Sequence, residues 1–270
     1  MSKSNSSKFG DLTTRFVQET ENAGLTKPGE GVAEWARRAL EFEADALQSQ
    51  VLDSESPRLM LCCSRQWGKS TVTSVRAVWE AIRHPGALVL AAAPCLRQSG
   101  EFLRKVRGHL RRLEMKVRTD GVNPLSLLLE NDSRLVALPG EESTVRGYSA
   151  ARLLVVDEAS RVPDALYYAL RPILATSGGA LWLMSTPHGQ RGFFHEEWVH
   201  GGEGWTRFSA RAEECPRIAK EFLQREREAL GERWYRQEYC CEFAASEDQM
   251  FTRELIDSAI SPEAEPLKVW

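Results

Sequence analysis

The chain has 270 residues, a hydrophobic content of 42% and a formal net charge of −3. This length allows one large domain, or a domain with a small second unit, and the composition supports a buried core. No apolar run approaches the roughly 18 residues of a membrane-spanning helix, and the weak net charge is not typical of a protein that binds DNA tightly over its whole surface.

The N-terminal part is predicted to be a tail followed by helices. Residues 1–10 are rich in Ser and Lys and lack the apolar core of a secretory signal, so we expect a disordered tail there. Residues 11–52 favour helices with Trp35, Leu40 and Leu47 as apolar anchors. Asp45 is expected to cap a second short helix.

Strands alternate with helices through the rest of the chain. In order, the pattern predicts a buried strand at 58–63, a helix from Ser70 to Arg83, a strand from Ala87 to Ala93, a basic helix at 95–113, a hairpin from Leu125 to Leu138, a strand at 153–156, a helix with Pro163 near its start, a strand at 180–185, a strand from Trp205 to Ser209, and a charged helix at 217–240. Such alternation predicts a mainly parallel sheet with helices on both faces.

The first buried strand runs directly into a candidate phosphate-binding loop. The stretch CSRQWGKST occupies residues 63–71 and ends in Gly68-Lys69-Ser70-Thr71. Backbone N–H groups of such a loop converge on an anion, and the helix N-terminus adds positive potential. Lys69 is expected to reach the β and γ phosphates and the Ser70 hydroxyl to bind Mg²⁺. The usual leading glycine is replaced by Cys63, so an ordinary strand, turn and helix is the alternative for this segment.

A second strand ends in two carboxylates. Asp157 and Glu158 follow the apolar run LLVV at residues 153–156. Ligands of open α/β sheets bind at the carboxyl ends of strands. Asp157 is expected to hold Mg²⁺, directly or through water, and Glu158 to orient and deprotonate the attacking water. Together with the loop at 63–71, the pair predicts an ATPase that uses ATP and Mg²⁺.

A third strand ends in small hydroxyl residues. Ser185 and Thr186 follow the apolar run ALWLM at residues 180–184. A hydroxyl in this place can contact the γ-phosphate or the attacking water and lose that contact on hydrolysis. A plain strand followed by a proline turn is the alternative.

Positive charge is concentrated in one predicted helix. Seven Lys or Arg residues lie between Leu103 and Arg118. Arg104, Arg107 and Arg111 share one helical face by their spacing. Such a face could contact DNA phosphates without sequence preference, and a solvated helix surface is the alternative.

The six cysteines show no metal-binding spacing. Cys62 and Cys63 are adjacent in a predicted strand and should therefore point to opposite faces of the sheet. We expect the cysteines to be small buried residues of a protein in a reducing compartment.

Together these segments resemble the ATPase domain of the large terminase subunit, the genome-packaging motor of tailed bacteriophages, over about residues 30 to 260. The family's loop typically reads Ser-Arg-Gln-x-Gly-Lys-Ser/Thr and often lacks the leading glycine. The resemblance implies that Ser64, Arg65, Gln66, Trp67, Gly68, Lys69, Ser70 and Thr71 bind nucleotide. It also implies that Arg65 senses the γ-phosphate and that Gln48, or else Gln50, contacts adenine.

The resemblance assigns further roles downstream. Arg146, before the acidic strand, matches an arginine proposed to complete the neighbouring subunit's site as a finger on the transferring phosphoryl group. Ser185 and Thr186 match the family's coupling motif. Residues after 211 resemble its helical lid. The implied fold is an α/β P-loop ATPase of the additional-strand, catalytic-glutamate type, with a mainly parallel sheet flanked by helices and a small helical lid.

The expected domains are a tail at 1–10, the ATPase core with its N-terminal helices at 11–210, and a lid with the start of a linker at 211–270. The family's usual nuclease half has no counterpart after Phe251, so nuclease activity is not expected from this chain. A cloned ATPase fragment and a natural ATPase-only form are both open.

The resemblance implies an ATP-driven motor that moves double-stranded DNA into a procapsid. Its partners would be DNA, the portal protein, the small terminase subunit and further copies of the chain in a ring, a pentamer in relatives, at the portal vertex in the host cytoplasm. The alternatives are a helicase-like ATPase that remodels nucleic acid and a non-catalytic, nucleotide-gated scaffold. Loss of ATP turnover in Glu158→Gln would separate an enzyme from a scaffold.

Overall fold

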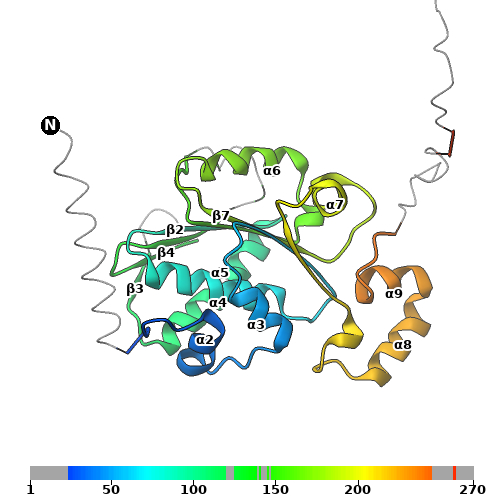
Figure 1. Ribbon diagram of the computed structural model, residues 1–270, viewed down its shortest axis with the longest axis horizontal. Helices are drawn as coiled ribbons and strands as arrows, with labels where there is room; N and C mark the ends of the chain where they lie inside the picture. Colours follow the sequence, from blue (N-terminus) through cyan, green and yellow to red (C-terminus); the bar gives the residue numbers. More distant parts are fainter. Residues whose placement is uncertain are drawn as a thin grey trace, which may run out of the picture.

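The computed structural model describes residues 24–119, 125–138, 140, 145, 147–244 and 258–259. Its centre is an eight-stranded sheet in the order β3-β4-β5-β2-β6-β7-β1-β8 (Figure 1). The strands are β1 (Arg58–Cys63), β2 (Leu88–Ala92), β3 (Val117–Arg118), β4 (Ser126–Leu129), β5 (Arg134–Leu138), β6 (Leu153–Asp157), β7 (Ala180–Ser185) and β8 (Thr206–Ala210). The six strands from β5 to β8 in this order are parallel, whereas β3 and β4 form an antiparallel extension.

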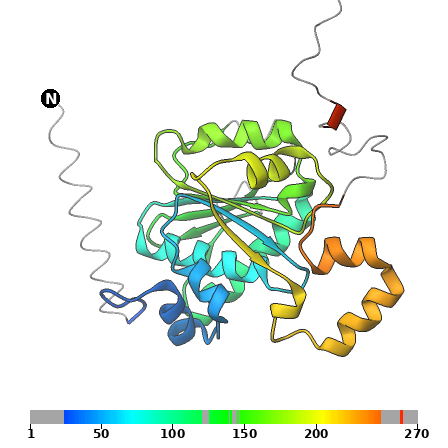
Figure 2. The same cartoon turned by 45° about the vertical axis from the view of Figure 1, so that its right-hand side comes forward.

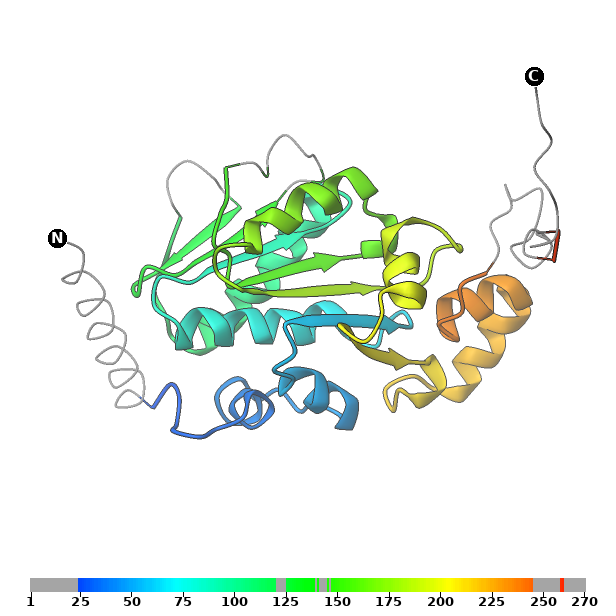
Figure 3. The ribbon, with the colours of Figure 1, turned by 45° about the horizontal axis from the view of Figure 1, so that its top comes forward.

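Helices cover both faces of the sheet (Figures 1 and 3). One face packs against α2 (Val32–Leu40), α3 (Ala46–Leu52), α4 (Lys69–Arg83) and α5 (Leu96–Arg112). The other packs against α6 (Asp164–Leu170), the 3₁₀ turn η3 (Arg171–Leu174) and α7 (Gly192–His200). The predicted fold class, a mainly parallel α/β sheet flanked by helices, is therefore confirmed.

Alternation along β1 divides its side chains between the two cores. Cys63 belongs to the cluster under α4 and α5, and Cys62 belongs to the cluster under α6 and α7. The predicted opposite orientation of the two cysteines is confirmed, because successive strand residues point to opposite faces.

Most predicted boundaries agree with the observed ones to within a residue or two. Asp45 caps α3 as predicted: its side chain accepts a bond from the Gln48 N–H, and the Gln48 side chain accepts one from the Asp45 N–H. Helix α4 ends at Arg83, and the following turn contains Gly86 at φ 73°. The hairpin predicted between Leu125 and Leu138 is formed by β4 and β5.

The charged C-terminal helix was predicted as one element at 217–240, and this was wrong. It is two helices, α8 (Lys220–Leu230) and α9 (Glu232–Tyr239), which stand beside the core at its β8 side (Figure 2). Gly231 joins them at φ 76° and ψ 161°, a conformation that is almost confined to glycine. Leu223, Tyr235 and Tyr239 form a small core of their own between the two helices and the turn η4 (Ala212–Glu214).

Several predictions fall on residues outside the described ranges. These are the tail at 1–10, helical structure at 11–23, Arg146, and most of the expected linker after residue 244. Among the residues that the structure does describe, none of the helices has the length and apolar character needed to cross a membrane.

Candidate nucleotide-binding site

Three parallel neighbouring strands end at one edge of the sheet and carry the predicted motifs there. In the order β6-β7-β1, the loop of residues 64–68 follows β1, the acidic pair ends β6, and Ser185 ends β7. Cys62 is in register with Ser185, and Asp157 with Met184, so the three strand ends are level. This edge is where open α/β sheets bind ligands.

The loop is shaped by two residues with positive φ and by its lysine. Gly68 precedes α4 at φ 102°, and Gln66 has φ 64°. A Cβ atom on Gly68 would lie 3.2 Å from the Gln48 amide nitrogen, so a larger residue would be both strained and crowded. The buried Lys69 donates from Nζ to the carbonyl oxygens of Cys63, at 2.8 Å, and Ser64, at 3.0 Å. Its ammonium group is therefore held at the mouth of the loop.

The loop and the acidic strand meet at Ser70 and Asp157. Ser70 Oγ donates to Asp157 Oδ2 at 2.9 Å, and the N–H of Glu158 donates to Asp157 Oδ1 at 2.9 Å. Burial raises the pKa of Asp157, and the Ser70 bond and the Lys69 charge oppose that rise. A hydroxyl and a carboxylate side by side are hard oxygen ligands of the kind that Mg²⁺ prefers, so these two residues fit the predicted metal.

Glu158 lies beside this pair in a left-handed backbone conformation, at φ 50°. Burial raises its pKa, while the charge of Lys69 lowers it and that of Asp157 raises it further. A carboxylate whose proton affinity is increased in this way is a better proton acceptor than a solvated one. The geometry suits the predicted general base.

Ser185 and Thr186 are connected to the acidic strand by a serine that the sequence analysis missed. Ser160 Oγ lies 2.6 Å from Ser185 Oγ and donates to the Thr186 carbonyl at 2.8 Å, and the Ser160 N–H donates to Ser185 Oγ at 3.2 Å. The turn η2 (Ala159–Arg161), directly after Glu158, places it there. The signal available in the sequence was a hydroxyl residue two positions after the predicted base.

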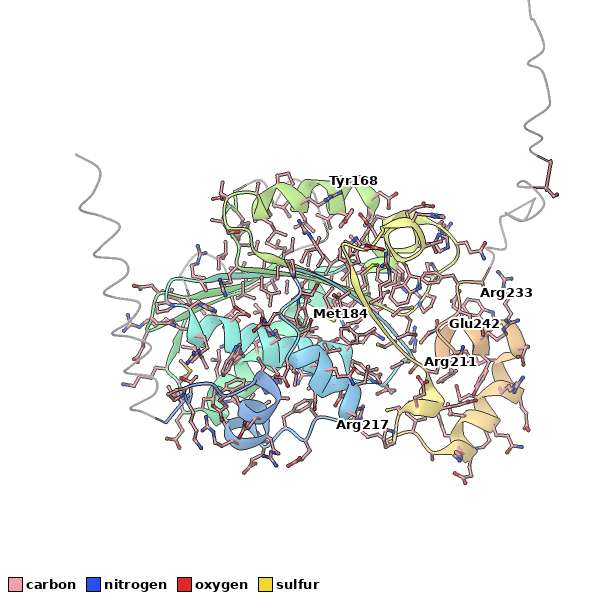
Figure 4. All side chains as sticks on the ribbon, viewed as in Figure 1. Tyr168, Met184, Arg211, Arg217, Arg233 and Glu242 are labelled. Carbon is pink, nitrogen blue, oxygen red and sulfur yellow. The ribbon has the colours of Figure 1, made fainter. Side chains whose placement is uncertain are left out.

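Gln48 and Trp67 are part of the support of the loop. Gln48 is buried, and its Nε2 donates to the Trp67 carbonyl at 2.9 Å, whereas Gln50 is exposed. The Trp67 side chain is buried in the core under α4. The same carbonyl accepts from Arg217 Nη2 at 2.7 Å, and Arg217 Nη1 donates to Asp45 at 3.0 Å. Arg217, which the sequence analysis missed, thus joins the segment before α8 to the loop and to the cap of α3 (Figure 4).

Arg65 contacts the C-terminal helices. Its Nε donates to Glu238 Oε2 of α9 at 2.5 Å, and its N–H donates to the Glu238 carbonyl at 3.2 Å. Arg161 of η2 lies 3.8 Å from the other oxygen of Glu238. Sequence reasoning found Arg65 but neither Glu238 nor Arg161. The loop, the turn after the predicted base and α9 therefore share one carboxylate.

The remaining predicted residues fall into two groups. Ser64 is buried at the start of the loop, Gln66 is exposed, and the Thr71 hydroxyl accepts from Lys105 Nζ at 3.2 Å. The predicted DNA-contacting residues Arg104, Arg107 and Arg111 are exposed on α5, where Arg104 pairs with Glu101 at 2.5 Å. Arg146 lies outside the described residues, so the structure does not place it.

Solved structures of similar fold include large terminases. The ATPase domain of the Thermus phage P74-26 large terminase has a TM-score of 0.71 and 22% identity, over 80% of this chain and 100% of that one. The large terminase of a second thermophilic bacteriophage, solved in complex with ADP, has a TM-score of 0.65 and 13% identity, over 74% of this chain and 54% of that one.

Sequence relatives agree. The large terminase subunit of Thermus phage G20c is 26% identical over 249 residues, which cover 79% of this chain and 51% of the relative, and that of Escherichia phage T5 is 25% identical over 73% and 47%. The chain thus spans about half the length of the curated relatives it matches. The family model for the N-terminal part of the terminase large subunit, T4likevirus-type, matches residues 60–258. The chain belongs to the terminase large-subunit family, and the site described above lies in its ATPase domain.

Proposed function

We propose that this chain hydrolyses ATP and uses the energy to move double-stranded DNA into a procapsid. The observation that carries the proposal is the contact of Ser70 with Asp157, flanked by Lys69 and Glu158 at the carboxyl edge of the sheet. These four groups supply what phosphoryl transfer to water requires, namely a phosphate cradle, a metal site and a base. The structures and relatives that the chain resembles are large terminases.

Each residue has a distinct part in the proposed reaction. The loop N–H groups and Lys69 bind the phosphates, and Ser70 and Asp157 hold Mg²⁺. Bound Mg²⁺ neutralises charge that develops on the β and γ phosphate oxygens. Glu158 orients the attacking water and accepts its proton. Arg65 is exposed at the loop, and its guanidinium can bind a γ-phosphate oxygen in place of Glu238.

The motor would be completed by partners. Arg146 is proposed to reach the site of a neighbouring subunit in a homo-oligomeric ring, a pentamer by resemblance, because an arginine finger supplied by another subunit is worth roughly 10³–10⁵ in turnover. The portal protein, the small terminase subunit and double-stranded DNA are the other proposed partners, at the portal vertex in the host cytoplasm. Residues 211 onward would serve as the lid of this ATPase, and nuclease activity is not proposed for this chain.

The deciding experiment measures the ATP hydrolysis rate per subunit against protein concentration with Mg²⁺ present. Glu158→Gln should remove turnover while nucleotide still binds, which separates an enzyme from a nucleotide-gated scaffold. Arg146→Ala should remove the rise in rate with concentration. Arg37→Ala, which removes an exposed arginine of α2, is the matched control and should behave as the wild type.

Two outcomes would contradict the proposal. A wild-type chain that binds Mg·ATP but never turns it over would favour the scaffold. A rate that does not depend on concentration, and is the same in Arg146→Ala, would leave a self-sufficient ATPase and remove the finger.

The DNA contact is tested separately. We propose that Arg104, Arg107 and Arg111 contact DNA phosphates, since all three are exposed on one face of α5. Replacing them with Gln should weaken binding to duplexes of any sequence. It should also reduce the slope of log affinity against log salt by about 0.9 for each phosphate that is no longer neutralised. An unchanged slope would show that DNA binds elsewhere.

A further inference from the structure

Helix α5 has a second polar row, on the side turned toward the nucleotide site. Lys105, His109 and Arg112 are spaced four and three residues apart, so they share one face of the helix. Lys105 Nζ donates to Thr71 Oγ1 at 3.2 Å, and His109 Nε2 lies 3.0 Å from Ser74 Oγ, both on α4. Arg112 donates to the Leu40 carbonyl at 2.7 Å. The row thus packs on α4 and the end of α2, whereas the exposed arginines face away.

Lys105 is placed at the first turn of the helix that follows the phosphate loop. Its partner Thr71 is the residue after Ser70, whose hydroxyl bonds Asp157. The charges of Lys69 and Lys105 both act to lower the pKa of Asp157, and the charge of Asp157 acts in turn on Lys105. Two ammonium groups therefore lie within electrostatic reach of the proposed metal site, and the sequence motif accounts for only one of them.

The surroundings of Lys105 do not satisfy a desolvated cation. The side chain is half-buried, and burial lowers its pKa, with the charge of Asp157 as the main opposing influence. Its one hydrogen-bond partner in the described part of the chain is a neutral hydroxyl. Burying a charge is costly unless an anion compensates it, and an ammonium on a flexible stem can turn from a hydroxyl to a phosphate oxygen nearby.

We propose that Lys105 is a second nucleotide-binding lysine, which contacts the α and β phosphates from the Thr71 side of α4. This inference rests on the proposed function, because it requires the nucleotide to bind at the loop after β1. The loop and the helix N-terminus cradle the α and β phosphates, and Lys69 reaches the β and γ phosphates. Lys105 thus serves the end of the phosphate chain that ADP and ATP have in common.

The test compares the affinity of the whole chain for Mg·ADP and for Mg·ATPγS by calorimetric titration. Lys105→Met keeps the apolar stem and removes the charge. It should weaken both nucleotides by a similar factor of roughly 10 to 100, the range for a hydrogen bond to a charged group. Lys105→Arg keeps the charge and should retain most of the affinity. Lys116→Met, at an exposed lysine beyond α5, is the matched control and should bind as the wild type does.

The outcomes separate this inference from the proposed function. Wild-type ADP affinity in Lys105→Met would overturn it, even if ATPγS affinity fell. Equal loss in Lys105→Arg and Lys105→Met would make packing the cause and would also overturn it. A wild-type chain that binds neither nucleotide would refute the proposed function as well. Thermal unfolding without nucleotide checks that each variant is folded, and Lys105→Gln gives the same comparison if the methionine lowers the midpoint.

Discussion

The contact between His109 and Ser74 predicts a specific dependence of stability on pH. Its imidazole lies between α5 and α4, with Ser74 Oγ at 3.0 Å from Nε2. Burial lowers the pKa of His109 from 6.5 to about 4, and the neighbouring charges of Arg112 and Lys105 act in the same direction. The folded protein therefore holds this histidine neutral at a pH where the unfolded chain protonates it.

The sign and size of the effect follow from linkage. Below pH 6.5 the unfolded state binds a proton that the folded state excludes, so this contribution to stability is complete above pH 6.5 and is lost as pH falls toward 4. The difference between 6.5 and about 4 corresponds to about 3 kcal/mol at full effect. At pH 5, where the fold is more easily kept, the same two values give a loss of about 2 kcal/mol.

The assay is urea unfolding of the wild type and His109→Gln at pH 7.5, 6 and 5. Glutamine keeps a hydrogen-bonding group and a good helix propensity but does not titrate. Carboxylates titrate in both proteins and cancel in the comparison. The free energy of unfolding of the wild type should therefore fall by about 2 kcal/mol more than that of the variant between pH 7.5 and 5. Parallel curves would refute the reasoning, because they would show that the folded protein accepts the proton freely.

Three further predictions concern stability. Arg217→Ala removes bonds to Asp45 and to the loop carbonyl of residue 67, and should lower the free energy of unfolding by about 1–2 kcal/mol in urea titration; no change would make the contact dispensable. Gly231→Ala should cost about 1–3 kcal/mol because its φ of 76° and ψ of 161° strain any side chain, whereas Gly108→Ala, in α5 with open space around it, should cost nothing or stabilise. Trp35→Ala, fully buried, should cost about 3–5 kcal/mol by the same titration, and a smaller loss would mean that the core there can collapse.

Local patterns explain why so much of the fold was predictable. The run into the loop, Gly68 at positive φ and the start of α4 depend on neighbours in sequence, and strand β1 and helix α4 were predicted to within one residue. The meeting of Ser70 with Asp157 was also predictable, because parallel strands bring their carboxyl ends to one edge. Long-range pairs were not. Arg65 and Glu238 are 173 residues apart, and no periodicity in a helix of mixed charge indicates which carboxylate turns inward.

Gln48 shows how one residue can satisfy two explanations. The resemblance implies that it contacts adenine, a role that stays a prediction. Local structure explains the same residue differently: Asp45 and Gln48 form the reciprocal cap of α3, and the Gln48 amide then supports the loop through the Trp67 carbonyl. A cap needs an acceptor and a residue with a long amide three positions later. The spacing in the sequence therefore had a structural cause of its own.

The pairing of α4 with α5 connects the proposed nucleotide site to the proposed DNA contacts. Helix α4 begins at the phosphate loop, and its Thr71 and Ser74 bond Lys105 and His109 of α5. The exposed arginines lie on another face of that same helix. If Lys105 leaves Thr71 for a phosphate, the force acts on α5 near its middle, and the arginines must move with it because a helix is stiff. A cross-test follows from this reasoning: Mg·ADP should change DNA affinity in the wild type and not in Lys105→Met, whereas an equal change in both would show that the nucleotide acts on DNA by another route.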